Sequence, residues 1–84
     1  MEARNKSLTL QWIKSDYRNI QHLSKKGLND KEIIMEAVKQ NGLALRYASE
    51  RLKDDEEVGL IAVRNTPYAK EYLSDRLKKD YDFN

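Results

Sequence analysis

The sequence predicts an all-α domain of about six short helices, paired as three stacked helical hairpins in a short α-solenoid-like bundle. Three observations predict it. A segment of 25 residues occurs twice in succession. Apolar residues recur at helical spacing within each copy. Only three glycines and one proline interrupt 84 residues, and ten leucines, five isoleucines and three valines supply a core.

The repeat covers most of the chain. Residues 29–53 and 54–78 align at an offset of 25 residues with ten identities and no gap. Residues 4–28 align as a degenerate copy, and residues 79–84 form a short tail. Units of this length bury their apolar faces against their neighbours, and terminal units are atypical for that reason. We therefore interpret residues 1–84 as a single helical-repeat domain in which the first unit is an N-terminal cap.

Each unit is expected to open with a helix. Asn29 is followed three residues later by Glu32, which is the spacing of a capping box, and Asp54 and Glu57 repeat it. The degenerate unit is expected to have its first helix over residues 7–14. The apolar stripes behind the two predicted caps are Ile33, Ile34, Ala37 and Val38 in one copy, and Val58, Ile61, Ala62 and Val63 in the other.

A turn and a second helix of about ten residues are expected to complete each unit. Gly42 predicts a left-handed residue that ends the first helix, whereas Thr66 and Pro67 predict a cap and a first helical position. The degenerate unit is expected to have its second helix over residues 16–26, closed by Gly27. Helices this short are not stable alone in water, so each must pack against neighbours. The second stripes are Ala44, Leu45, Ala48 and Leu52, then Ala69, Leu73 and Leu77.

Residues 30–55, DKEIIMEAVKQNGLALRYASERLKDD, resemble the repeat of the domain-of-unknown-function family 4116. The family pattern has an acidic start, an A-V-K-Q-N-G centre and an A-L-x-Y-A-S-x-x-L close. The second copy departs from it at residues 64–67, where RNTP stands in place of KQNG. The resemblance implies a helical repeat, and it implies no activity, cofactor or site residue.

Composition limits the classes of function. Sixteen basic and 14 acidic residues give a net charge of +2, far from the clustered excess of a nucleic-acid-binding domain. The chain has no cysteine, and no apolar run has the length of a signal peptide or a membrane span. We expect a cytoplasmic, soluble protein without a cofactor, and the charged residues 78–82 favour a monomer.

A catalytic or metal site is not expected. His22 is the only histidine, and no catalytic or phosphate-loop motif is present. The carboxylates of residues 54–57 could hold a metal or act as acid and base. Acids at a helix start also complement the helix dipole and cap its free amides, which is the reading we favour. The sequence therefore predicts no enzyme.

Equivalent positions of the three units form columns in a stacked structure. Lys14, Lys39 and Arg64 form one such column, which we call the basic column. Neighbouring helices lie about 8–10 Å apart, so these cations are suited to an acidic peptide or a phosphate backbone. Alternatively, each is a cation that stabilises a helix C-terminus by a few tenths of a kcal/mol.

A second column holds His22, Tyr47 and Tyr72. Exposed, it is an aromatic strip for a protein partner or for stacking on bases. Buried, it is helix packing with polar tips at the rim. Trp12 is expected to cover the open end of the first unit. A third column, interpreted as small residues that permit close helix approach, contains Ser24, Ser49 and Ser74.

The function that these features favour is a non-catalytic protein-interaction or scaffold module with an unidentified protein partner, because a rigid helical-repeat surface is what such a fold offers. The candidate partner-binding residues are Lys14, Lys39, Arg64, Tyr47 and Tyr72. One alternative is a nucleic-acid-binding domain that uses the basic column, against which the near-neutral charge balance stands. Another is a purely structural spacer.

Overall fold

The computed structural model describes residues 6–80, and over them the expected all-α class is confirmed. Nine helical segments and no strand are present in that range, with residues 4–5 of the first repeat and 81–84 of the tail lying outside it. The segments, with η for a 3-10 helix, are α1 (Lys6–Ser15), η1 (Tyr17–His22), α2 (Lys25–Leu28), α3 (Lys31–Gln40), η2 (Gly42–Tyr47), α4 (Glu50–Lys53), α5 (Glu56–Asn65), η3 (Pro67–Tyr72) and α6 (Asp75–Asp80).

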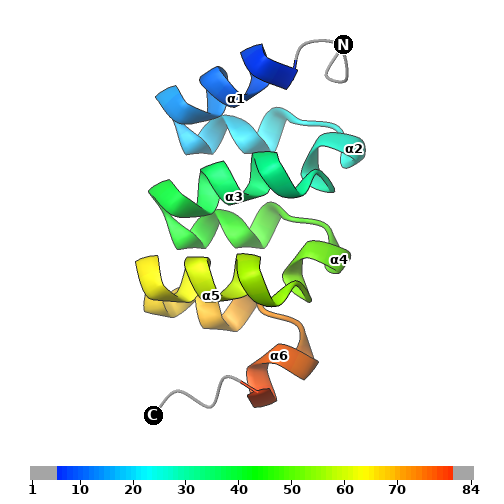
Figure 1. Cartoon of the computed structure of the whole chain (residues 1–84), viewed down its shortest axis with the longest axis vertical. Coiled ribbons are helices and arrows are strands. Elements are labelled where there is room, and N and C mark those ends of the chain that lie inside the picture. The colour runs from blue at the N-terminus through cyan, green and yellow to red at the C-terminus, as the bar shows by residue number, and fades with distance from the viewer. Residues whose placement is uncertain (1–5, 81–84) are drawn as a thin grey trace.

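The elements recur once per repeat and stack along one direction (Figure 1). Helices α1, α3 and α5 lie side by side in one layer, with α3 in contact with both of the others. The 3-10 helices run back along a second layer, and the short helices α2, α4 and α6 lie along one edge (Figure 1). We call the three successive sets of α, η and short α helices unit 1, unit 2 and unit 3.

The second helix of each predicted hairpin is not continuous, which differs from the expectation of six helices. It divides into a 3-10 helix and a short α-helix, separated by an extended residue before Ser24, Ser49 and Ser74. The serine hydroxyls cap the short helices: Ser49 Oγ accepts the amide hydrogen of Leu52 at 3.3 Å, and Ser74 Oγ that of Leu77 at 3.2 Å. The serines are therefore structural, as interpreted from the sequence, and their hydroxyls act as helix caps.

The predicted caps of the long helices are wrong by one residue. The N-cap residues of α3 and α5 are Asp30 and Asp55, whereas Asn29 and Asp54 were predicted. Asp30 Oδ1 accepts the amide hydrogen of Glu32 at 3.0 Å, and the carboxylate of Asp55 caps α5 in the same way. The preceding residues are thereby left for contacts between units, because their side chains are not needed at the helix start.

Gly42 does not adopt a left-handed conformation, because no described residue has a positive φ. Asn41 ends α3 in an extended conformation, with φ −156° and ψ 116°. Gly42 is needed for a close approach instead: a Cβ there would overlap the carbonyl oxygen of Ala62 and lie 3.0 Å from Thr66 Cβ. The Gly42 amide also donates to Thr66 Oγ1 at 2.9 Å.

The core is a continuous column between the two layers, drawn from every unit. Each unit contributes apolar side chains from both its long helix and its second segment, so removing one fully buried leucine or isoleucine should cost about 2–5 kcal/mol. The buried apolar residues are Ile13, Ile20, Ile33, Ile34, Ala37, Val38, Ala44, Leu45, Ala48, Leu52, Val58, Ala62, Val63, Ala69, Leu73 and Leu77.

Candidate interaction surfaces

Matching ion pairs join each unit to the next. Lys31 Nζ lies 3.0 Å from Asp55 Oδ2 and 2.9 Å from Glu57 Oε1. Hydrogen bonds to Glu57 and Asp55 raise the pKa of the Lys31 amine. The first junction has the matching set Lys6, Asp30 and Glu32. The long helices are therefore held in register by lysines that bridge to the following unit.

The acidic cluster of residues 54–57 belongs to these junctions. Asp54 accepts from Ser74 Oγ at 2.6 Å and from Arg76 Nε at 2.9 Å, and Asp55 caps α5. Hydrogen bonds from Ser74 and Arg76 lower the pKa of Asp54. Within residues 6–80, no group of three or more histidine or acidic side chains is placed to hold a metal ion.

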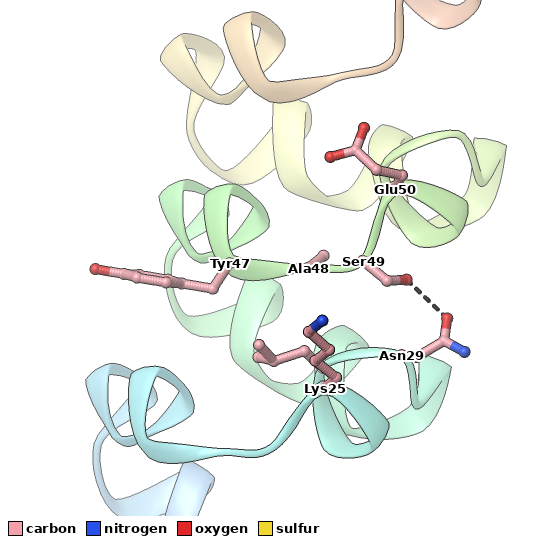
Figure 2. A pocket seen from close by; sticks show the side chains of 7 residues that line it. Lys25, Asn29, Tyr47, Ala48, Ser49 and Glu50 are labelled. Atoms are coloured by element: carbon pink, nitrogen blue, oxygen red, sulfur yellow. Dashed lines mark hydrogen bonds between the residues drawn. The ribbon is translucent and has the colours of Figure 1, made fainter.

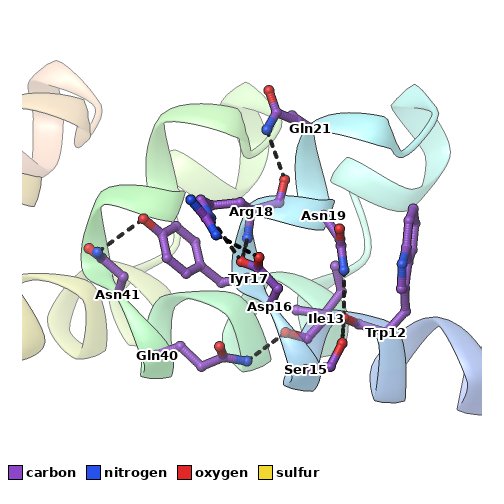
Figure 3. A network of polar contacts seen from close by, with 10 residues as sticks. All are labelled: Trp12, Ile13, Ser15, Asp16, Tyr17, Arg18, Asn19, Gln21, Gln40 and Asn41. Atoms are coloured by element: carbon purple, nitrogen blue, oxygen red, sulfur yellow. Dashed lines mark hydrogen bonds and ion pairs between the residues drawn. The ribbon is translucent and has the colours of Figure 1, made fainter.

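The degenerate first unit is joined to unit 2 by a polar network (Figure 3). Gln40 Nε2 donates to the carbonyl oxygen of Ile13 at 2.6 Å. Asn41 Nδ2 donates to the hydroxyl of Tyr17 at 3.1 Å, so the residue that replaces glycine in this unit has a structural role of its own.

A hollow of about 490 Å³ lies where unit 1 meets unit 2 (Figure 2). Backbone pairing from the Ser49 amide to the Leu28 carbonyl, at 3.1 Å, joins the two segments that border it. Figure 2 shows Tyr47, Lys25 and Glu50 placed around this space. The residues that line it are Lys25, Leu28, Asn29, Tyr47, Ala48, Ser49 and Glu50.

Leu28 distinguishes this hollow from the equivalent positions in the other units. The matching residues are Lys53 and Lys78. The side chain of Lys53 is 20% exposed, whereas Lys78 is exposed. A lysine therefore occupies this position at the junction between units 2 and 3, whereas Leu28 of unit 1 is partly buried against the core and also lines the hollow.

The three rings of the predicted aromatic column have different surroundings. His22 is exposed and stacks on Trp12, with ring centroids 6.1 Å apart. Tyr47 and Tyr72 are half-buried and share a cation: the Arg46 guanidinium lies 5.3 Å from the Tyr47 ring centre and 6.0 Å from that of Tyr72. Such contacts typically contribute about 0.5–1 kcal/mol at exposed sites. Both tyrosines therefore contribute to packing and to the surface.

The basic column lies at the C-terminal ends of α1, α3 and α5, along the edge opposite the short helices (Figure 1). Lys14, Lys39 and Arg64 are all exposed. Ion pairs between residues 6 and 80 involve other cations, and none includes these three. The structure thus leaves the column open to solvent.

The hollow and its neighbours include residues that sequence reasoning had missed. Tyr47 was predicted from its recurrence, whereas Lys25 and Leu28 do not recur in kind. The signal in the sequence was a departure from the repeat, because Leu28 is apolar where the aligned residues are lysine. Aligning the repeats selects positions that are identical between the copies, so it does not select a position such as Leu28.

The model of the family Domain of unknown function (DUF4116) matches residues 5–53 and again residues 30–78. Each match spans two structural units, and the two matches are offset by one repeat. Comparison with curated proteins and with solved structures finds no match. None of the described helices is both long enough and apolar enough to cross a membrane.

Proposed function

We propose that this chain, which belongs to the DUF4116 family, acts as a non-catalytic protein-interaction module. The observation that carries the proposal is Leu28, an apolar side chain in a hollow whose packing accepts lysine at the same position in the other units. A half-buried leucine that stands where the other units have lysine, and that lines an open space, is suited to contact a partner.

The hollow has the size and chemistry of an anchor site. Pockets of about 300–1,000 Å³ with mostly apolar walls and a few polar groups are typical of binding sites. Here Leu28, Ala48 and the Tyr47 ring offer apolar surface, while Lys25 and Glu50 add one charge of each sign. An apolar or aromatic side chain of a protein partner fits this description, since such residues are the usual anchors of interfaces.

The placement of polar groups supports binding over catalysis. A general acid or base must have a reacting group within hydrogen-bond reach. Asp54 and Asp55 are instead engaged in the junction between units 2 and 3. His22 stacks on Trp12 at the surface. These three groups thus have contacts within the described chain that do not include a second catalytic group.

The test is a selection of peptides from a displayed random library against the wild-type chain. Leu28→Lys is the informative variant, because it installs the residue found at the same position in units 2 and 3. Leu60→Lys is its matched control: Leu60 is 38% exposed on α5 and does not line the hollow. Circular dichroism must first show that both variants melt as the wild type does.

We expect enriched peptides to share an apolar or aromatic residue and to bind the wild type and Leu60→Lys alike. Leu28→Lys should weaken them about tenfold or more, because burying a leucine-sized contact contributes about 1.5–3 kcal/mol. A library that yields no peptide, or peptides that bind all three proteins equally, would contradict the proposal.

A further inference from the structure

The basic column differs from the cations that join the units. Lys6, Lys31 and Arg76 each bridge to carboxylates within the described chain. In contrast, no ion pair between described residues includes any of the three side chains of the column, Lys14, Lys39 and Arg64. Lys6 and Lys31, which join the units, stand at the N-terminal ends of α1 and α3, whereas the column lies at the C-terminal ends of the long helices.

Capping of the helix ends does not account for the column. Asn65 Nδ2 donates to the Lys39 carbonyl oxygen at 2.7 Å, and Gln40 Nε2 donates to the Ile13 carbonyl oxygen at 2.6 Å. Neutral amides of the following unit thus satisfy these terminal carbonyls, and no hydrogen bond of the described residues has a cation of the column as its side-chain donor. Hydrogen bonding to these carbonyls therefore does not explain the lysines at the ends of α1 and α3.

Their spacing distinguishes between anionic ligands. Helices in contact lie about 8–10 Å apart, so one cation recurs at about that interval along the edge. A peptide extended as a polyproline II helix has three residues per turn and advances about 3.1 Å per residue, so every third side chain lies on the same face, about 9 Å from the last. Single-stranded nucleic acid has charges at a closer interval, and the chain's near-neutral balance gives it little general attraction for phosphates.

We propose that the basic column binds an acidic peptide segment in an extended conformation, with one carboxylate opposite each unit. The column lies at the C-terminal ends of the long helices, whereas the hollow is lined by residues of the segments 25–29 and 47–50. This second site goes beyond the proposed anchor site, and neither depends on the other. Each carboxylate of the peptide would form an exposed ion pair with one cation of the column. Three such pairs together should strengthen binding about tenfold at low salt.

The probe is a synthetic peptide with aspartate at every third residue and neutral residues between, titrated at low salt and followed by amide NMR shifts. A second peptide has the same composition with its aspartates adjacent, and an oligothymidine tests the nucleic-acid alternative. The column variant is Lys14→Gln, Lys39→Gln and Arg64→Gln together. Its control, equal in net charge and also at exposed positions, combines Lys26→Gln, Lys78→Gln and Lys79→Gln.

We expect the spaced peptide to shift amides near Lys14, Lys39 and Arg64, and the column variant to bind it about tenfold more weakly. The control variant should bind within about twofold of the wild type. Equal losses in both variants would show that only net charge matters and would overturn the proposal. So would an absence of shifts, a preference for the adjacent aspartates, or column-dependent binding of the oligonucleotide alone. The Leu28→Lys chain should bind the spaced peptide normally, so the two sites can fail separately.

Discussion

The guanidinium of Arg76 donates from Nε to Asp54 Oδ1 at 2.9 Å and from Nη2 to the Asp54 carbonyl oxygen at 2.8 Å. One unit earlier, Arg51 makes the same two contacts with Asn29, at 2.9 and 2.6 Å. A carboxylate and a neutral amide thus occupy the same place. The same contact geometry therefore joins both pairs of units, with a charged acceptor in one and a neutral acceptor in the other.

Asp54→Asn should therefore be tolerated at neutral pH. The amide oxygen can accept the hydrogen bonds from Arg76 and Ser74, as the side chain of Asn29 does in the first junction. We expect a small decrease in melting temperature by circular dichroism, and a clearly larger one for Asp54→Ala, which removes the acceptor. Equal decreases for the two variants would show that the charge, and not the acceptor, stabilises the junction.

The stability of the fold should decrease in acid. Hydrogen bonds from Ser74 and Arg76 lower the pKa of Asp54 below 3.8. At Asp55, burial alone would raise the pKa. Hydrogen bonds from the Val58 amide and from Lys31 outweigh burial, so the pKa of Asp55 is lowered as well. A lowered pKa stabilises the folded state above the unfolded value and loses that contribution as pH falls through the folded value. Melting temperatures should be constant from about pH 7 to 5 and fall below about pH 4.

The Asp54→Asn variant is the control for the pH series, because it removes one of the two carboxyl groups, Asp54 and Asp55, whose pKa is lowered. Its melting temperature should depend less steeply on pH below about pH 4 than that of the wild type. An identical slope for the two proteins would assign the acid sensitivity to other carboxylates.

Gly42→Ala should destabilise the chain by about 1–3 kcal/mol, because the added methyl group overlaps the Ala62 carbonyl and forces α5 away from η2. Urea denaturation followed by circular dichroism measures this difference. Gly59→Ala is the control: its position holds Thr9 and Ile34 in the other units, and alanine favours a helix by about 1 kcal/mol over glycine. A neutral Gly42→Ala would refute the close-approach explanation.

The first unit should prevent copies of the chain from stacking end to end. Trp12 is 43% exposed where the matching residues, Ala37 and Ala62, are fully buried. The backbone of Ala62 lies directly against Gly42 of the preceding unit, so a tryptophan is too large for this packing. We expect a monomer in sedimentation velocity at every concentration, and association of Trp12→Ala at high concentration. A wild-type chain that associates as readily as Trp12→Ala would contradict this account.

The pattern of apolar residues was sufficient to predict the helical class and the pairing of elements in each repeat. It could not place Ser49, because a serine between two apolar stretches has the same effect on hydrophobic periodicity whether it caps a helix or faces a neighbour. The pattern also could not separate a 3-10 helix from an α-helix over the residues that precede it. That distinction depends on hydrogen bonds and not on composition.

Asn29 and Asp54 show a second limit. Either is a good helix cap by residue type, and so is the aspartate that follows each of them. Which one begins the helix depends on Arg51 and Arg76, since these arginines engage the earlier residue from 22 positions away. Contacts between units therefore decided a local feature, and only the folded stack shows them.

The most direct test of the proposed interaction is an amide shift map of the wild-type chain with a peptide obtained from the library selection. The account predicts that the largest shifts fall in residues 25–29 and 47–50, on the two sides of the hollow. It predicts further that they disappear in Leu28→Lys and persist in Leu60→Lys. Shifts centred on any other surface, or unchanged in Leu28→Lys, would contradict it.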